Sequence, residues 1–317
     1  MRKGQNPAKF VKDVPRPERI TVALLNYIPF LSGFYAETLE VLKACLRSIR
    51  DDPGLPFDLL VFDNGSCPDV RDFLVSEKDA GRIQYLVLSE KNVGKGGAWN
   101  VIFPGIPGKI LAYTDSDVLF SPGWLKRSVE ILETYPNVGM VTARPFRTPP
   151  EFYSRTVDWA RSAAGSTVKE EQYISWEMFL EFNLSLGQTE EENRKVYAET
   201  RDWVVSYNGV TALAGASHWQ FTAFKSVLQQ FVPFDMEKPM GQVRQLDKRV
   251  NDAGLLRLMV SDPLAMNMSN TLGYVRGELK APKKAARASL KKRLLEFGPV
   301  KRLLLALYNR IFHWYYS

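Results

Sequence analysis

The 317-residue sequence predicts an α/β fold with a mainly parallel sheet flanked by helices. Two observations lead to this fold class. Short apolar runs alternate with segments of helical periodicity along the first half of the chain, which is the pattern of a parallel sheet with helical crossovers. Polar clusters directly follow several of the apolar runs, and open sheets of this kind bind ligands beyond the carboxyl ends of their strands.

Apolar runs in the first half predict four strands, and the segments between them predict helices. Each helix is expected where apolar residues recur at helical spacing. In chain order the expected elements are a strand at 20–25, a helix at 37–49, a strand at 58–63, a helix at 70–79, a strand at 83–88, a turn and short helix at 94–100, and a strand at 109–114.

The second half has a different pattern. Residues 150–202 are rich in aromatic and acidic side chains, and we expect a helical excursion there that covers the site. Apolar runs resume from Trp203. A helix at 245–253 is expected to end at Gly254, before a strand at 255–260. This region should complete the sheet.

A basic segment ends the chain. The net charge is +7, and residues 279–317 hold ten Lys or Arg against one acidic residue. Leucines and aromatics recur there at roughly helical intervals, so we expect an amphipathic helical appendage at 277–317. Residues 280–317 are expected to contact an anionic membrane surface, with packing on the domain or binding of a partner as the alternative. Because the basic excess is confined to one segment, no nucleic-acid partner is expected.

Composition limits the class of protein further. Cys45 and Cys67 are too few and too far apart for a disulfide framework or a cysteine zinc site. No stretch resembles a signal peptide or holds the roughly eighteen apolar residues that span a bilayer. We therefore expect a cytoplasmic protein that the basic segment can hold peripherally at the cytoplasmic face of a membrane.

The strongest chemical signal is Asp115-Ser116-Asp117, which follows the strand expected at 109–114. Two carboxylates at a strand end can hold a divalent cation, and that cation neutralises the phosphates of a nucleotide. Oxygen ligands suit Mn²⁺ and Mg²⁺ alike. Taken alone, Asp-x-Asp is more often only a polar turn. Here two further polar clusters follow neighbouring strands, namely Asp63-Asn64-Gly65-Ser66 and Asn92-Val93-Gly94-Lys95-Gly96-Gly97.

Each of these two clusters also has a purely structural interpretation. Glycines supply the positive φ angles of a turn that leads into a helix. Asp63 precedes Asn-Gly, which is good turn chemistry. The recurrence of polar clusters at successive strand ends favours ligand binding.

In this order the motifs resemble those of the family 2 glycosyltransferases, which have the GT-A fold. The resemblance spans about residues 20–270 and rests on Val61-Phe62-Asp63-Asn64-Gly65-Ser66, Asn92-Val93-Gly94, Asp115-Ser116-Asp117 with Pro122-Gly123-Trp124, and Val138-Gly139. It implies a GT-A domain at 1–276, with a donor half at about 18–145 and an acceptor half at about 146–276. It also implies an inverting, metal-dependent transfer from a nucleotide-diphosphate sugar to a glycan or lipid-linked hydroxyl, in bacterial-type surface glycan or glycolipid synthesis.

The resemblance also assigns roles to individual residues. Asp63 would contact the nucleobase, in a pocket that the loop around Asn26 also lines. The residues expected at the nucleotide sugar are Asn26, Asp63, Asn92, Gly94, Lys95, Asp115, Ser116 and His218, and those expected at the metal are Asp115 and Asp117. His218 could instead be a packed, hydrogen-bonded residue. A histidine that the family places after its last strand is replaced by Asn267, so Asn267, water or phosphate would complete the metal shell.

Asp247 is the expected general base, because it is the one acid that matches the acidic pair of the family at the start of a late helix. A base must lie within hydrogen-bond reach of the acceptor hydroxyl. The alternative is a solvated helix face on which Asp247 pairs with Lys248, Arg249 or Arg244.

Two other functions stay open. A sugar-phosphate nucleotidyltransferase shares the architecture, but Asn26-Tyr27-Ile28-Pro29 lacks the glycine-rich loop with Arg and Lys that such enzymes carry after the first strand. A noncatalytic adaptor of the same fold would use the basic segment at the membrane, and the incomplete acidic pair keeps that interpretation open.

Overall fold

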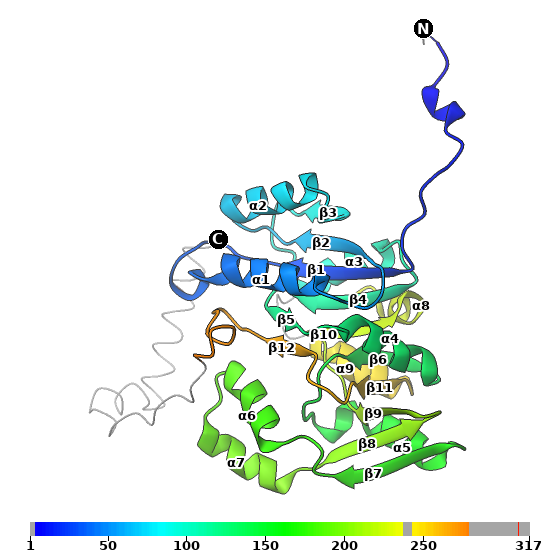
Figure 1. Cartoon of the computed structure of the whole chain (residues 1–317), viewed down its shortest axis with the longest axis vertical. Helices are drawn as coiled ribbons and strands as arrows, with labels where there is room; N and C mark the ends of the chain where they lie inside the picture. Colours follow the sequence, from blue (N-terminus) through cyan, green and yellow to red (C-terminus); the bar gives the residue numbers. More distant parts are fainter. Residues whose placement is uncertain (1–3, 237–242, 279–309, 311–317) are drawn as a thin grey trace, which may run out of the picture. The chain divides into compact units, whose positions relative to one another are not determined.

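The computed structural model describes residues 4–236, 243–278 and 310, and the chain divides into two compact units, 1–279 and 280–317. Every helix and strand given below belongs to the first unit (Figure 1). The predicted amphipathic segment 277–317 belongs to the second unit from residue 280 onward, and apart from Gly277, Glu278 and Arg310 it lies outside the described residues. The domain boundary predicted at residues 276 and 277 stays a prediction.

One large mixed sheet organises the described part of the first unit, with ten strands in the order β3-β2-β1-β4-β10-β6-β11-β9-β8-β7. The first four of these are mutually parallel, and β6 pairs in parallel with β11. The remaining pairs are antiparallel. The strands are β1 (Ile20–Asn26), β2 (Asp58–Asp63), β3 (Tyr85–Leu88), β4 (Ile110–Asp115), β6 (Val138–Thr142), β7 (Ser166–Glu171), β8 (Asp202–Tyr207), β9 (Val210–Ala214), β10 (Gln220–Phe224) and β11 (Leu256–Met259). A small second sheet pairs β5 (Val118–Phe120) with β12 (Ala265–Asn267).

Helices pack on both faces of the large sheet (Figure 1). They are α1 (Thr38–Arg50), α2 (Pro68–Asp79), α3 (Gly94–Gly105), α4 (Trp124–Thr134), α5 (Ser154–Ser162), α6 (Trp176–Ser185), α7 (Glu190–Glu199), α8 (Lys225–Leu228) and α9 (Val243–Asp252). In β1, Val22 and Leu24 join one apolar cluster while Ala23 and Leu25 join another, because successive strand side chains point to opposite faces. The first cluster includes buried residues of α1, α2, α4 and α5, and the second includes those of α3, α8 and α9.

Most of the elements that the sequence predicts agree with the structure to within a few residues. The interpretation of residues 150–202 as wholly helical is wrong at one place, since Ser166–Glu171 forms β7 antiparallel to β8. This strand lies at the edge of the sheet, and most of its side chains are exposed. An edge strand of this kind has no apolar alternation, and its Lys and Glu residues disfavour pairing with a further chain.

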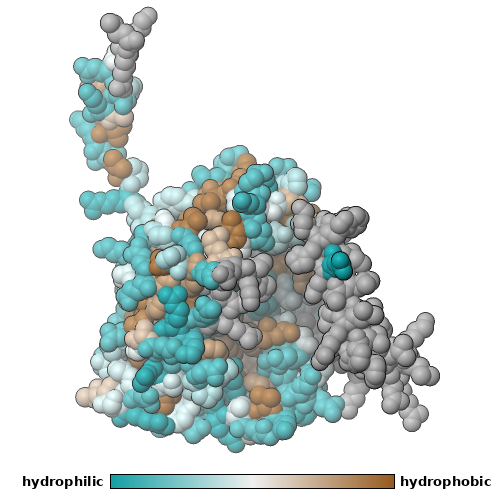
Figure 2. Space-filling view, turned by 180° about the vertical axis from the view of Figure 1, so that it is seen from behind, coloured by the Kyte–Doolittle hydropathy of each residue, from teal (hydrophilic) through white to brown (hydrophobic). Residues whose placement is uncertain are grey.

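The surface has no single dominant apolar area in the view of Figure 2, where apolar residues form spots among polar ones on the part not covered by grey atoms. Exposed apolar side chains in the described residues include Phe10, Val14 and Phe34. Scattered residues of this kind are normal on folded proteins. Within the described ranges, no helix is both long and apolar enough to cross a membrane.

Candidate functional site

Three parallel strands bring the predicted site residues to one edge of the sheet. In the register of β1 with its neighbours, Asn26 pairs with Asp63 of β2, and Leu25 pairs with Asp115 of β4. Because parallel strands share one direction, these carboxyl ends lie at the same edge. The polar clusters that follow them are therefore neighbours in space, as the sequence predicts.

Asp63 organises the loop after β2. Its Oδ1 accepts a hydrogen bond from Asn26 Nδ2 at 2.9 Å, and its Oδ2 accepts one from the backbone N of Ser66 at 3.0 Å. The side chain is 0% exposed, and Arg71 Nε lies 3.9 Å from Oδ2. One oxygen thus stabilises the turn after β2 and the other contacts β1, which agrees with the structural interpretation of Asp63. Its contact with a nucleobase stays a prediction.

The glycine loop is held against the loop after β2 by Asn64. Asn64 Oδ1 accepts from the backbone N of Val93 at 2.9 Å, and its Nδ2 donates to Asn92 Oδ1 at 2.9 Å. Asn92 Oδ1 also accepts from the backbone N of Gly94 at 2.8 Å. Gly65 has φ +86°, and a Cβ there would lie 2.9 Å from the backbone N of Asn92. The two loops therefore pack closely together, and α3 begins at Gly94.

Lys95, in the first turn of α3, contacts Asp115 at the end of β4. Its Nζ lies 2.7 Å from Asp115 Oδ2, while the hydroxyl of Tyr113 donates to Asp115 Oδ1 at 2.7 Å. Both members of the ion pair are partly exposed. A cationic group from the glycine loop and a carboxylate from the strand end are thus brought together where solvent reaches them.

Asp117 lies in the turn between β4 and β5, together with Ser116. Burial and, next, the carboxylate of Asp115 raise the pKa of Asp117 to about 7, while Lys95 lowers it. The raised pKa shows that the two carboxylates crowd negative charge into a partly desolvated place. A divalent cation would relieve that crowding, and carboxylate oxygens are its preferred ligands.

The remaining metal ligands would have to come from outside the two aspartates. The described residues contain no group of three or more His, Cys, Asp or Glu side chains that could hold a metal ion. Asn267 lies opposite Val118 in the pairing of β12 with β5, but its Oδ1 already accepts from the backbone N of Ser269 at 2.6 Å. Two carboxylates completed by phosphate and water are the usual set for Mg²⁺ or Mn²⁺ beside a nucleotide. The residues present therefore fit such an ion.

A second polar group lies beside the end of β4. The loop between β9 and β10 holds His218 and Trp219, and the carbonyl of Trp219 accepts from the backbone N of Asp115 at 3.0 Å. His218 Nδ1 lies 2.5 Å from Asp247 Oδ2. Asp247 Oδ1 in turn accepts from Arg257 Nη2 at 2.5 Å. The structure thus joins two predicted site residues through one direct contact.

The solvated-face alternative for Asp247 is wrong for the partners whose side chains are described. Lys248 pairs with Asp252 instead, and Arg249 donates to the carbonyl of Phe231. Asp247 is 6% exposed, and its cationic partner Arg257 is 0% exposed. The interpretation of His218 as a packed, hydrogen-bonded residue agrees with its contact to Asp247.

Arg257 belongs to this polar group, and the sequence predictions missed it. It lies in β11, inside the apolar run Leu255–Val260, and a lone charge in such a run is a signal of a buried partner. Its Nη1 donates to the carbonyl of Phe152 at 2.6 Å, and its Nη2 also donates to the carbonyl of Ala216. Burial lowers the pKa of Arg257 to about 10, so the guanidinium keeps its charge at neutral pH.

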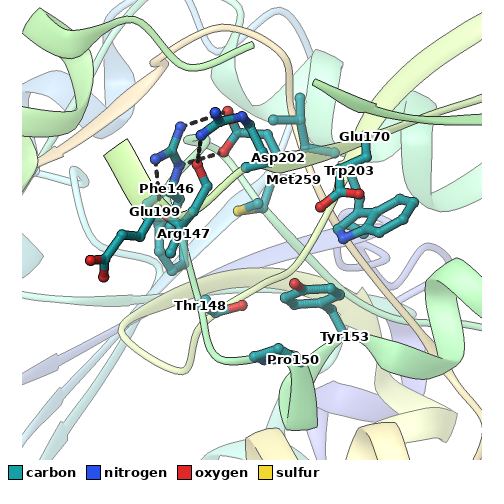
Figure 3. Close-up of a pocket in the computed structure, with 14 residues that line it drawn as sticks. Phe146, Arg147, Thr148, Pro150, Tyr153, Glu170, Glu199, Asp202, Trp203 and Met259 are labelled. Carbon is teal, nitrogen blue, oxygen red and sulfur yellow. Dashed lines mark hydrogen bonds and ion pairs between the residues drawn. The ribbon is translucent and has the colours of Figure 1, made fainter. Parts of the chain in front are cut away.

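A pocket of about 210 Å³ lies in the second half of the chain (Figure 3). Figure 3 shows Trp203 and Glu170 close together on one side, and Arg147 joined to Asp202 on another. Arg147 Nε donates to Asp202 Oδ1 at 2.8 Å. The lining residues are Phe146, Arg147, Thr148, Pro150, Tyr153, Glu170, Glu199, Thr200, Arg201, Asp202, Trp203, Leu213, Ala214 and Met259. All of them fall in the half predicted to hold the acceptor.

The chain is similar to known glycosyltransferases. Residues 33–186 match the family model described as Glycosyl transferase family 2. A curated relative, an uncharacterized glycosyltransferase of Nostoc sp., is 26% identical over 123 residues, which is 39% of this chain and 35% of the relative. The match thus spans about a third of that relative. The resemblance to family 2 predicted from the motifs is confirmed.

The chain is also similar to two solved structures at low sequence identity. The mannosyltransferase PcManGT of Pyrobaculum calidifontis, in complex with GDP-Man and Mn²⁺, is 14% identical with a TM-score of 0.45, over 78% of this chain and 58% of that chain. TarS 1–349 of S. aureus, in complex with UDP-GlcNAc, is 13% identical with a TM-score of 0.47, over 78% of this chain and 57% of that chain. The α/β sheet together with the family match confirms the predicted GT-A fold class.

Proposed function

Because residues 33–186 match family 2 of the glycosyltransferases, we propose that the protein transfers a sugar from a nucleotide-diphosphate sugar to a hydroxyl acceptor, with inversion at the anomeric carbon. The observation that carries the proposal is the contact of Lys95, in the first turn of α3, with Asp115 at the end of β4, beside Asp117 in the next turn at the carboxyl edge of the parallel strands. Both kinds of charge that a diphosphate and its metal need are present at that edge.

The donor would bind with its diphosphate at this group of charges. Asp115 and Asp117 would hold a Mn²⁺ or Mg²⁺ ion, which when bound supplies neutralisation of the diphosphate and Lewis acidity toward the leaving phosphate. Lys95 would contact a phosphate oxygen, since its ammonium group is partly exposed and lies beside Asp115. Asn26, Asp63, Asn92, Gly94 and Ser116 belong to the loops that would surround the nucleotide.

The experiment that tests the function is a calorimetric titration with a panel of nucleoside diphosphates and nucleotide sugars, with and without Mn²⁺. We expect the nucleotides of one nucleobase to bind, and to bind more tightly when Mn²⁺ is present. Binding of none of them would contradict the transferase and favour the noncatalytic adaptor. Binding of one nucleotide to the same extent with and without Mn²⁺ would support the donor site and contradict the role of the metal.

The pocket of Figure 3 is our proposed contact for the acceptor glycan. Its aromatic lining includes Trp203 and Tyr153, and its polar lining includes Glu170 and Thr148. The Oγ1 atom of Thr148 is buried and has no hydrogen-bond partner among the described residues. A sugar offers apolar ring faces to aromatic side chains and hydroxyls to such polar atoms, so this lining suits a sugar ring.

Replacing Trp203 by alanine should weaken sugar binding and leave nucleotide binding unchanged. The loss expected from one aromatic contact is about tenfold or less in affinity. Saturation-transfer NMR with simple methyl glycosides would measure it. Tyr173→Ala is the matched control, because Tyr173 is an exposed aromatic residue outside the pocket lining. Equal sugar binding by the wild type and Trp203→Ala would contradict the proposal that this pocket binds the acceptor.

The basic segment 280–317 would bring the protein to its acceptor. We propose a peripheral contact with the anionic cytoplasmic face of a membrane and a lipid-linked or surface-glycan acceptor, since the segment combines clustered Lys and Arg with leucines and aromatics. In a flotation assay with anionic vesicles, the full chain should float and a chain truncated after residue 278 should not. Equal behaviour of the two proteins would contradict the membrane contact.

A further inference from the structure

Asp247, the residue that the sequence suggests as general base, is poorly placed for that role. Its side chain is 6% exposed. Arg257 Nη2 and His218 Nδ1 each lie 2.5 Å from one of its two oxygens. A general base must reach the proton that it removes, directly or through one water. Each oxygen already contacts a partner inside the fold, and the low exposure of the side chain leaves an acceptor hydroxyl little access to Asp247.

His218 is the more exposed partner, at 22% of its side chain. An ionised carboxylate can only accept a hydrogen bond, so the hydrogen in the contact with Asp247 belongs to His218 Nδ1. The other ring nitrogen, Nε2, forms no hydrogen bond or ion pair with the described residues. In a neutral imidazole whose proton sits on Nδ1, Nε2 carries a lone pair. This nitrogen can accept a proton.

The loop that carries His218 is hydrogen-bonded to the end of β4. His218 directly precedes Trp219, whose carbonyl accepts from the backbone N of Asp115 at 3.0 Å. Ser217 forms an isolated bridge with Gln220, the first residue of β10, and β10 pairs with β4. The loop that carries His218 is therefore attached to the strand end at which the carboxylates of the donor site begin.

Arg257 fixes the other members of this group. Besides its ion pair with Asp247, its Nη2 donates to the carbonyl of Ala216, two residues before His218. The guanidinium is fully buried, and the ion pair keeps Asp247 beside a positive charge. One side chain thus holds both the carboxylate and the loop of the imidazole, which preorganises the ring for a single orientation.

We propose that His218 is the catalytic base of this protein, acting through Nε2, and that Asp247 and Arg257 are positioning residues. The proposal rests on the transferase function proposed above. In the step itself, Nε2 takes the proton of the acceptor hydroxyl while the acceptor oxygen forms a bond to the anomeric carbon. The bond from that carbon to the diphosphate oxygen breaks, and its electron pair leaves with the diphosphate. Asp247 stabilises the imidazolium, which then releases its proton to solvent.

The first test compares the wild type with His218→Asn and His218→Ala. The assay is release of nucleoside diphosphate from the nucleotide sugar that the protein binds, with water as the acceptor. We expect turnover to fall by about 100- to 10,000-fold with donor affinity unchanged, because a base contributes that much to the rate. Added imidazole should restore part of the turnover of His218→Ala. His313→Asn, at the other histidine of the chain, is the control.

Turnover of His218→Asn at the wild-type rate would overturn the proposal, and so would a loss of donor affinity equal to the loss of turnover. Failure of the wild type to bind any nucleotide sugar would be a failure of the proposed function instead. The two failures are therefore distinguishable by calorimetry on the same samples.

The second test needs no substrate. Nitrogen-15 NMR of the two histidines at neutral pH, with His313→Asn to assign them, reports which ring nitrogen carries the proton. We expect a neutral His218 with its proton on Nδ1, and a change in that tautomer in Asp247→Asn. A merely structural role for Asp247 would not move this signal. A proton on Nε2, or an imidazolium, would overturn the proposal because no lone pair would be left to accept a proton.

Discussion

Asp117→Ala is expected to reduce the affinity for nucleoside diphosphate in Mn²⁺ to the affinity measured without the ion. The two carboxylates of the turn after β4 would supply the protein's ligands, and no group of three acidic, His or Cys side chains in the described residues could replace them. Removing one of two anionic ligands therefore leaves a site with little preference for a divalent cation. Calorimetry with and without Mn²⁺ measures the difference directly.

Asp158→Ala is the matched control for this experiment, because Asp158 is an exposed aspartate of α5 outside the strand-end edge. It should bind like the wild type in both conditions. If Asp117→Ala kept the full metal dependence, the ion would have to be held elsewhere. Lys95→Met separates the cationic contribution, since it should weaken nucleotide binding with and without the ion alike.

The sequence predicted well which polar residues meet at the ends of β1, β2 and β4, because the signals for this arrangement are local. Asp63 and Asp115 each follow an apolar run directly, and the parallel pairing of the strands is enough to bring their carboxyl ends together. Gly65 is a local signal as well, because its positive φ and the close approach of Asn92 both need a residue without Cβ. Turn chemistry and strand pattern were enough for this half.

The second half was harder to predict because its decisive contacts join segments that are distant in the chain. Asp247 and His218 are 29 residues apart, and no spacing rule relates them. Arg257 touches the carbonyls of Phe152 and Ala216, so its role depends on how four segments pack. The strand β7 was missed because an exposed edge strand lacks the apolar alternation that identifies buried strands. Tertiary packing decides each of these features.

Arg257→Met is expected to lower the free energy of unfolding by about 3–5 kcal/mol, since it leaves the buried carboxylate of Asp247 without its cation. Met approximates the stem of arginine, so the change mainly removes the charge and the donors. The carbonyls of Phe152 and Ala216 also lose their partner. Denaturant unfolding followed by tryptophan fluorescence measures the loss, provided that the slope of the transition stays unchanged.

The double variant Asp247→Asn with Arg257→Met shows whether the loss comes from an uncompensated charge. Removing both charges should be less destabilising than Arg257→Met alone, because the desolvated carboxylate is then absent. His218 keeps an amide oxygen as a possible partner in that protein, yet the anion that would stabilise its imidazolium is gone. We therefore expect the double variant to recover stability without recovering turnover. Recovery of both stability and turnover would mean that Asp247 contributes only to packing. Equal stability of Arg257→Met and the double variant would mean that the lost hydrogen bonds of Arg257 cause the destabilisation, and not the unpaired charge.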